Sequence, residues 1–227
     1  MPPPGPNPDP SGSTRTLSEA DSKSMLAQFG VPMAPERLAP DAAAAVAAAT
    51  EIGFPVVAKL CGDLIAHKTE RGLVRLGLAD AESVRVAADE LLAAATVDDG
   101  DVDVLIAPML RGNRELIAGL ADDPQFGMTV VLGIGGIFAE ALADVAVRLV
   151  PIERVDAEEM IDELRTQTLL GAFRGEPPVD RDRLCEVLLA LSAAALATPG
   201  LVSADLNPLI VVDGDPIAVD ALVEVRA

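Results

Sequence analysis

Hydrophobic residues recur at two different spacings along the chain, which predicts helices alternating with strands. In the first half, apolar residues three and four positions apart indicate helices, whereas short alternating or continuous apolar runs indicate strands. Ser18 is suited to cap the first helix, which Gly30 would end. The elements expected in this half are helices at 18–29, 41–52 and 80–95, and strands at 55–60, 73–78 and 103–110.

The second half begins with strands and ends with a hairpin. Strands are expected at 115–120, 129–136 and 147–152, with a short helix near 137–146, and helices follow at 156–170, with Asp156 as N-cap, and at 180–197. The last two strands, VSADLNPLIVV and DPIAVDALVEV, are joined by DGD, a strong hairpin signal. A turn centred on residues 213 and 214 makes Asn207 and Asp220 cross-strand neighbours.

Short connections between these strands favour antiparallel pairing. We therefore predict an α+β protein of two successive lobes, with mixed or antiparallel sheets flanked by helices and a ligand cleft near the junction. Residues 1–16 are rich in proline and poor in apolar residues, so we expect a disordered tail. The expected lobes span residues 17–108 and 109–227.

Composition narrows the partners and the compartment. The chain has 227 residues, half of them hydrophobic, and a formal net charge of −19. Such an acidic protein is a poor general partner for nucleic acid or an anionic membrane. The N-terminus lacks the pattern of a secretory signal, so we expect a cytoplasmic protein. Cys61 and Cys185 match no metal-ligand spacing, and free buried thiols are favoured over a disulfide.

The segment AKLCGDLIAHKTERG, residues 58–72, concentrates scarce nitrogen side chains. It holds His67, the single histidine, and Lys59 and Lys68, two of the three lysines. An imidazole can serve as general base, metal ligand or phosphoryl acceptor, although a lone loop histidine often only binds a backbone carbonyl. Metal binding is the weakest choice, because no further His or Cys lies at a suitable spacing. The cationic neighbours and flanking glycines favour an anion site.

Two further motifs fit phosphate chemistry. Asp205, Asn207 and Asp220 offer the hard oxygen donors that Mg²⁺ prefers, although Asp-x-Asn-Pro alone is more often an ordinary turn. The glycine-rich turn GIGGIFAE, residues 133–140, includes Gly135 and Gly136 but lacks a Walker lysine, and is weak evidence by itself.

Taken in order, several segments resemble the ATP-grasp subunit of the nucleotide-diphosphate-forming acyl-CoA synthetases, relatives of the succinyl-CoA synthetase β subunit. The likeness covers about residues 17–225. The matching segments are LSEADSKSMLAQFGVP, PVVAKL, HKTERGLVRLGL, RELIAGLADDPQFG, VVLGIGGIFAEALADVAVRLVPI, LLGAFRGEPPVD, ADLNPLIV and AVDA. The resemblance implies a two-lobed ATP-grasp fold that binds ATP or ADP with Mg²⁺.

The resemblance also implies a role for each candidate residue. Lys59 resembles the nucleotide-phosphate lysine, Glu115 an acid that contacts the nucleotide, and His67 a phosphoryl relay. Asn207 and Asp220 resemble the Mg²⁺ ligands, with Asp205 in support. The remaining nucleotide-binding candidates are Lys68, Met109, Gly135 and Gly136.

The family activity requires a second protein. The resemblance implies a CoA-binding α subunit that forms the acyl phosphate, and hence a hetero-oligomer that works as an acid–thiol ligase. Two rival functions remain: an ATP-dependent carboxylate–amine ligase, which needs no histidine, and a non-catalytic nucleotide-binding regulatory module. Three positions depart from the family pattern and bear on relay efficiency and nucleotide preference: Gly62 in place of Ser, Leu73 in place of Gly, and a segment around Pro108 that lacks a Glu.

Overall fold

The computed structural model describes residues 13–65, 71–136 and 143–226. In these ranges the strands are β1 Thr14–Thr16, β2 Arg37–Ala39, β3 Val56–Cys61, β4 Val74–Leu78, β5 Asp103–Pro108, β6 Glu115–Asp123, β7 Gly127–Ile134, β8 Val145–Leu149, β9 Leu201–Val212, β10 Asp215–Ala218 and β11 Leu222–Arg226. The helices are α1 Glu19–Ala27, α2 Ala42–Ile52, α3 Ala81–Ala93, α5 Arg154–Glu163, α6 Gln167–Leu170 and α7 Arg181–Ala197, with a 3₁₀ turn, η1, at Val97–Asp99.

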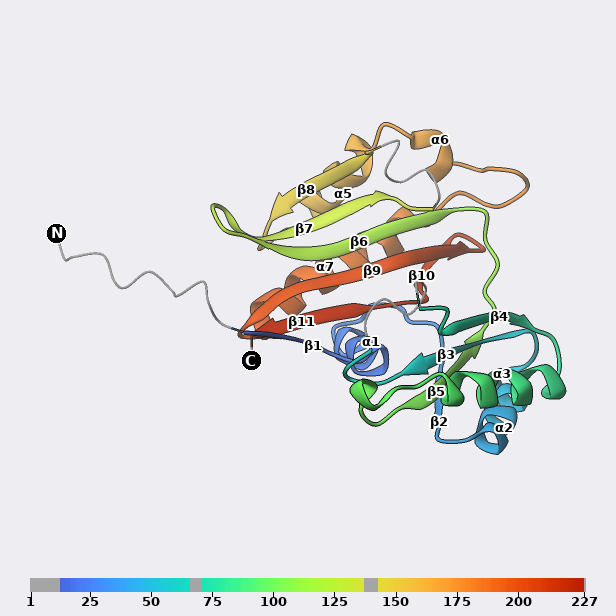
Figure 1. The fold of residues 1–227 in the computed structure, drawn as a ribbon. Coiled ribbons are helices and arrows are strands. Elements are labelled where there is room, and N and C mark those ends of the chain that lie inside the picture. The colour runs from blue at the N-terminus through green and yellow to red at the C-terminus, as the bar shows by residue number, and fades with distance from the viewer. Residues whose placement is uncertain (1–12, 66–70, 137–142, 227) are drawn as a thin grey trace.

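The strands form two sheets, and every pairing between the named strands is antiparallel, as the short connections predict. The larger sheet has seven strands in the order β1-β11-β9-β6-β7-β8, with β10 paired to β9. The smaller sheet has four strands in the order β2-β5-β3-β4. Figure 1 shows the two sheets as separate bodies, with the segment after β5 passing from one to the other.

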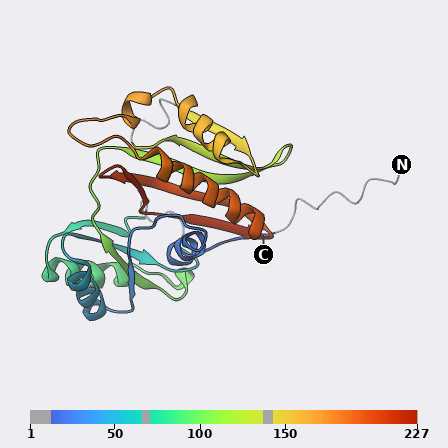
Figure 2. The ribbon, with the colours of Figure 1, turned by 180° about the vertical axis from the view of Figure 1, so that it is seen from behind.

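Each sheet has its own hydrophobic core. Helices α2 and α3 pack on the smaller sheet, with Leu60, Val84 and Ile106 fully buried between them. Helices α5 and α7 cover one face of the larger sheet, where Leu132, Met160 and Leu188 are fully buried (Figure 2). The predicted two-lobed α+β architecture is therefore confirmed.

Local caps explain where two helices of the smaller lobe begin and where one of them ends. The Asp41 carboxylate accepts a hydrogen bond from the Ala44 backbone N–H at 2.8 Å, and Gly53, with φ of +95°, ends α2. Asp80 caps α3 in a reciprocal arrangement with Ser83. These local signals lie in the sequence itself, which is why both helices were predictable.

The structure differs from the sequence-based assignment near the N-terminus. Thr14–Thr16, which composition assigned to a disordered tail, form β1 and pair with β11 at the edge of the larger sheet. Helix α1, assigned to the first lobe, packs in the core of the larger lobe through Leu26. Its start is fixed there by a hydrogen bond of 3.0 Å from the Val223 N–H to the Ser22 hydroxyl. Local composition cannot reveal such pairing with the distant C-terminus.

A second difference concerns the helix predicted at 156–170. It is two helices, α5 and α6, and the α5 N-cap is Glu153, whose N–H donates to the Asp156 carboxylate at 2.7 Å. The break between them is held by buried Asp144, which accepts hydrogen bonds from the backbone N–H groups of Arg165 and Thr166. Most of the short helix predicted near 137–146 lies outside the described residues.

The C-terminal hairpin has the predicted register. Asp215 lies opposite Val212 and Ala218 opposite Leu209, and the same register continues where Leu222 lies opposite Asp205. The pattern of turn residues therefore determined which residues face each other across this hairpin.

Two smaller findings complete the fold. Cys61 and Cys185 are buried thiols that are not joined in a disulfide, as expected. Within the described ranges, no helix combines the length and apolar character needed to cross a bilayer.

Candidate nucleotide site between the lobes

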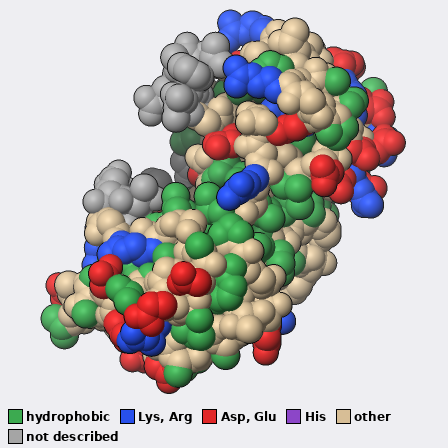
Figure 3. All heavy atoms as spheres, turned by 90° about the vertical axis from the view of Figure 1, so that its right-hand side faces the viewer, with side chains coloured by type: hydrophobic (Ala, Val, Ile, Leu, Met, Phe, Trp, Pro, Cys, Tyr) green, Lys and Arg blue, Asp and Glu red, His purple; other side chains and the backbone are tan. Residues whose placement is uncertain are grey.

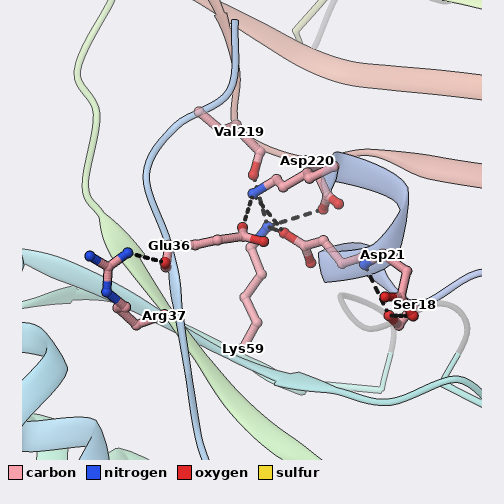
Figure 4. A network of polar contacts seen from close by, with 9 residues as sticks. Ser18, Asp21, Glu36, Arg37, Lys59, Val219 and Asp220 are labelled. Atoms are coloured by element: carbon pink, nitrogen blue, oxygen red, sulfur yellow. Dashed lines mark hydrogen bonds and ion pairs between the residues drawn. The ribbon is translucent and has the colours of Figure 1, made fainter. Parts of the chain in front are cut away.

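Lys59 extends from the smaller sheet into a socket formed by Glu19, Val219 and Asp220 of the larger lobe. It lies on β3, is 8% exposed, and its ammonium donates to the Glu19 carboxylate at 2.6 Å. The same ammonium donates to the Val219 carbonyl and the Asp220 carboxylate, each at 3.2 Å. Figure 4 shows Val219 and Asp220 facing the end of the Lys59 side chain, which comes from a different element. A lysine so deeply buried is stable only with such partners.

The socket continues inward as a chain of ion pairs. Lys23, four residues after Glu19 on α1, lies 3.2 Å from the Glu19 carboxylate and 2.6 Å from the Glu36 carboxylate. Burial raises the pKa of Glu36 despite its pairing with Lys23. Burial alone would lower the pKa of Lys59, but Glu19 and Asp220 outweigh it and raise this pKa, so the ammonium stays charged.

The predicted metal ligands gather beside this socket. The hairpin register places Asn207 opposite Asp220, between the residues of β9 that pair with β10 and those that pair with β11. There the Val219 N–H donates to the Pro208 carbonyl at 3.2 Å. Partial loss of solvation raises the pKa of Asp205, and repulsion from the Asp220 carboxylate raises it further. A hydrogen bond with Asn207 acts in the opposite direction.

This donor set fits a hard divalent cation. The carboxylates of Asp205 and Asp220 are near enough to repel each other, and Mg²⁺ beside them and the Asn207 amide would offset that repulsion. Mg²⁺ usually binds only one or two protein carboxylates and completes its coordination shell with water and phosphate oxygens. In the described part of the chain, no group of three or more His, Cys, Asp or Glu residues forms a fuller metal cage.

Glu115 and the glycine-rich turn lie against each other. The Gly135 N–H donates to the Glu115 carbonyl at 2.8 Å. A Cβ atom at Gly135 would lie only 3.1 Å from that carbonyl group, and one at Gly136 would lie 3.6 Å from the Glu115 carboxylate. Gly136 also has φ of +79°, so glycine is favoured there on two grounds. The structure thus brings Glu115, at the start of β6, against Gly135 and Gly136, which directly follow β7.

The connection between the lobes carries Met109. Its N–H donates to the Pro55 carbonyl at 3.0 Å, and its side chain is half-buried. Beyond it, Gly112 packs so closely on β9 that a Cβ atom would lie 2.3 Å from the Val211 carbonyl oxygen. In Figure 3, hydrophobic side chains extend between the two lobes.

His67 and Lys68 lie outside the described residues, but both flanks of their segment are anchored. Before it, Ile65 is buried in the core of the smaller lobe, and after it Leu73 is buried in the same core. The Arg71 guanidinium binds the Asp99 carboxylate through two hydrogen bonds of 2.6 and 2.9 Å. The histidine segment therefore starts and ends at fixed points.

Two of the three departures from the family pattern, Gly62 and Leu73, have a structural explanation. A Cβ atom at Gly62 would lie 2.8 Å from the Asp101 carbonyl oxygen, so a serine would force a shift of that loop. Leu73 fills core space that a glycine would leave empty.

Sequence reasoning missed the inner part of the socket. It singled out none of Glu19, Lys23 and Glu36, and the Val219 carbonyl has no sequence signal at all. One signal was available: Glu19 and Lys23 are four residues apart, on the helix face that also carries Leu26.

Comparisons with known proteins agree with this architecture. The model of a family described as ATP-grasp domain matches residues 10–225. The β subunit of acetate–CoA ligase [ADP-forming] I from Pyrococcus furiosus is 37% identical over 210 residues, covering 91% of this chain and 90% of that protein.

Solved structures agree as well. Acetyl-coenzyme A synthetase 1 of Ca. Korarchaeum cryptofilum, in complex with coenzyme A and Ca-AMPCP, is 34% identical with a TM-score of 0.86, covering 93% of this chain and 94% of that chain. A further structure of that enzyme contains Mg-AMPPCP, with its phosphohistidine segment pointing towards the nucleotide-binding site. It is 35% identical with a TM-score of 0.80, and the coverage is 93% of each chain.

The fold and the interlobe site define an ATP-grasp domain. Within that class, the chain belongs to the family of ADP-forming acetate–CoA ligases.

Proposed function

We propose that this chain is the ATP-grasp β subunit of an ADP-forming acyl-CoA synthetase, an acid–thiol ligase. Its part of the reaction is the transfer of a phosphoryl group between a phosphohistidine and ADP. In the full reaction, acyl-CoA, phosphate and ADP give the free acid, CoA and ATP. The observation that carries this proposal is the charged Lys59 between the lobes, directly beside the oxygen donors of Asp220 and its neighbours.

The described residues would divide the work on the nucleotide. Lys59 would bind phosphate oxygens, while Glu115, Gly135, Gly136 and Met109 would contact the rest of the nucleotide. Asp205, Asn207 and Asp220 would hold Mg²⁺, which when bound offsets phosphate charge and orients the phosphates. His67, with Lys68 beside it, would carry the phosphoryl group: the N–P bond to the imidazole breaks as a bond forms between phosphorus and a terminal oxygen of ADP.

This division of the reaction implies a second subunit. The relative from Pyrococcus furiosus is named as a β subunit, which supports a multisubunit enzyme here. We propose that a CoA-binding α subunit supplies the acyl phosphate and completes a hetero-oligomer.

The test is reconstitution with a CoA-binding α subunit and a panel of acyl-CoA substrates. ATP formed from acyl-CoA, phosphate and ADP is measured for the wild type, His67→Ala and Lys68→Met. We expect His67→Ala to lose activity by at least about a hundredfold, because the relay atom is removed, and to lose the acid-labile phosphate detected by mass spectrometry. Lys68→Met should retain a phosphorylated His67 with slower transfer.

Two results would contradict the proposal. Full activity of His67→Ala would show that His67 does not carry the phosphoryl group. Tight nucleotide binding by the wild type without turnover, across the panel and with the partner present, would indicate a regulatory module instead.

A further inference from the structure

The three described partners of the Lys59 ammonium lie in the larger lobe, whereas Lys59 itself lies in the smaller one. Glu19 is on α1, which packs in the larger core, and Val219 and Asp220 lie between β10 and β11. Lys59 therefore belongs to one lobe, and its ammonium binds the socket formed by the other.

The two carboxylates of the socket differ in depth. The Glu19 side chain has no exposed surface and lies 2.6 Å from the ammonium. The Asp220 side chain is 39% exposed and lies at 3.2 Å. A cation from solvent can therefore reach Asp220, while Glu19 stays enclosed behind Lys59.

Charge in the cluster points the same way. Lys23 and Lys59 are matched by three carboxylates, those of Glu19, Glu36 and Asp220. The carboxylates exceed the ammonium groups by one, and the most exposed carboxylate is that of Asp220, so a divalent cation from solvent would meet the excess negative charge there.

We propose that Glu19 is a positioning residue that keeps Lys59 in place while Asp220 changes partner. This proposal rests on the proposed function. When Mg-nucleotide binds, Asp220 leaves the Lys59 ammonium for Mg²⁺, and the N–H donor that Asp220 releases turns to a phosphate oxygen. The bond to Glu19 persists throughout, because a lysine has three donors and the inner carboxylate is out of reach of solvent.

The proposal gives Glu19 an effect beyond stability. Without the Glu19 charge, Asp220 becomes the single carboxylate that pairs with Lys59 among the contacts described, and Mg²⁺ has to break that pair. Loss of Glu19 should therefore raise the Mg²⁺ concentration needed for nucleotide binding, which a purely structural role would leave unchanged.

The experiment compares Glu19→Gln with Glu36→Gln in the full-length chain. Both substitutions neutralise a carboxylate of the same ion-pair chain, but in the described structure Glu36 pairs with Lys23 rather than with Lys59. The dissociation constant of ATP is measured by calorimetry over a range of Mg²⁺ concentrations. We expect Glu19→Gln to weaken ATP binding about tenfold to a hundredfold at low Mg²⁺, the size of a lost charge-assisted bond. Glu36→Gln should stay within about threefold of the wild type, because the Lys59 contacts remain.

Steady-state kinetics with the α subunit provide a second measurement. The KM for ADP should rise in Glu19→Gln with a smaller change in kcat, because the binding geometry is altered while the relay is intact. If Glu19→Gln fails to fold, the double variant Glu19→Gln/Lys23→Met is used instead of it in both measurements. The double variant removes one charge of each sign and so leaves the net charge of the cluster unchanged.

The outcomes separate the two proposals. If Lys59→Met weakens ATP binding and Glu19→Gln or the double variant binds like the wild type at every Mg²⁺ concentration, the positioning role of Glu19 is overturned and the proposed function stands. If the wild type itself does not bind Mg-ATP, both are overturned.

Discussion

At the scale of single residues, Asp99 shows how one carboxylate anchors the chain just after the segment that contains His67. It accepts two hydrogen bonds from the Arg71 guanidinium, and one each, at 2.8 Å, from the Thr96 N–H and hydroxyl. The hydrogen bonds from Arg71 first, and then those from Thr96, hold the pKa of Asp99 well below its usual range. Asp99 thus fixes the return point of the histidine segment.

Asp99→Asn should make the protein less stable at neutral pH and less sensitive to acid. Since the folded-state pKa is lowered, the stability that Asp99 contributes is present above its unfolded pKa of about 3.9 and is lost as pH falls toward the folded value. Chemical unfolding at pH 7, 4 and 3 measures this, and the difference between wild type and variant should shrink toward low pH.

Asp98→Asn is the matched control, because Asp98 is exposed on the same 3₁₀ turn. It should follow the wild type at each pH. A difference between Asp99→Asn and wild type that grows toward acid would contradict the assigned role.

At the scale of elements, Arg114 fastens the connection between the lobes to the loop after α6. Its buried guanidinium donates to the carbonyl groups of Gly171 at 3.0 Å and Pro177 at 2.6 Å, and to the Glu176 carboxylate at 3.1 Å. The Glu176 carboxylate also accepts from the Asn113 backbone N–H at 3.0 Å. The chain leaving β5 is therefore bound to a segment some sixty residues later.

Arg114→Met should destabilise the protein by about 3 kcal/mol, because it leaves the Glu176 carboxylate and the carbonyl groups without their donor. Hydrogen exchange should accelerate at residues 171–178 more than in α7. The measurements are denaturant unfolding and hydrogen-exchange mass spectrometry.

Arg85→Met tests whether any lost arginine has this effect. Arg85 pairs with Glu82 one turn earlier on the exposed face of α3. Its loss should change stability little. Equal effects of the two substitutions would show that the Arg114 bonds do not hold the loop.

At the scale of the whole molecule, Lys59 is the charged link between two separately packed cores. The lobes have independent hydrophobic clusters, and the described ion pairs of Lys59 cross between them. A ligand that binds the same groups should therefore couple the stability of the lobes.

Mg-ATP should raise the thermal unfolding midpoint of the wild type, because a ligand at a hundred times its dissociation constant adds about 2.7 kcal/mol to the stability of the folded state. Lys59→Met should lose most of this rise. Differential scanning calorimetry with ATP, with and without Mg²⁺, measures it. A full rise in Lys59→Met would place the nucleotide elsewhere.

The sequence by itself determined most of the local structure. The Ser18 cap of α1 and the register of the C-terminal hairpin depend on residues near in sequence, so their patterns were sufficient, and the caps of α2 and α3 are local in the same way. The same holds for the candidate ligands Asn207 and Asp220, which the hairpin register brings into line.

Tertiary structure alone decided which charges meet. Glu19, Lys59 and Asp220 are far apart in the chain, and their meeting depends on α1 packing with the C-terminal strands of the larger lobe rather than with its sequence neighbours. The strand β1 was hidden for the same reason, since its hydrogen bonds come from β11. Local patterns record the propensity of each segment, but the energy of burying an ion pair depends on partners that only the folded chain brings within reach.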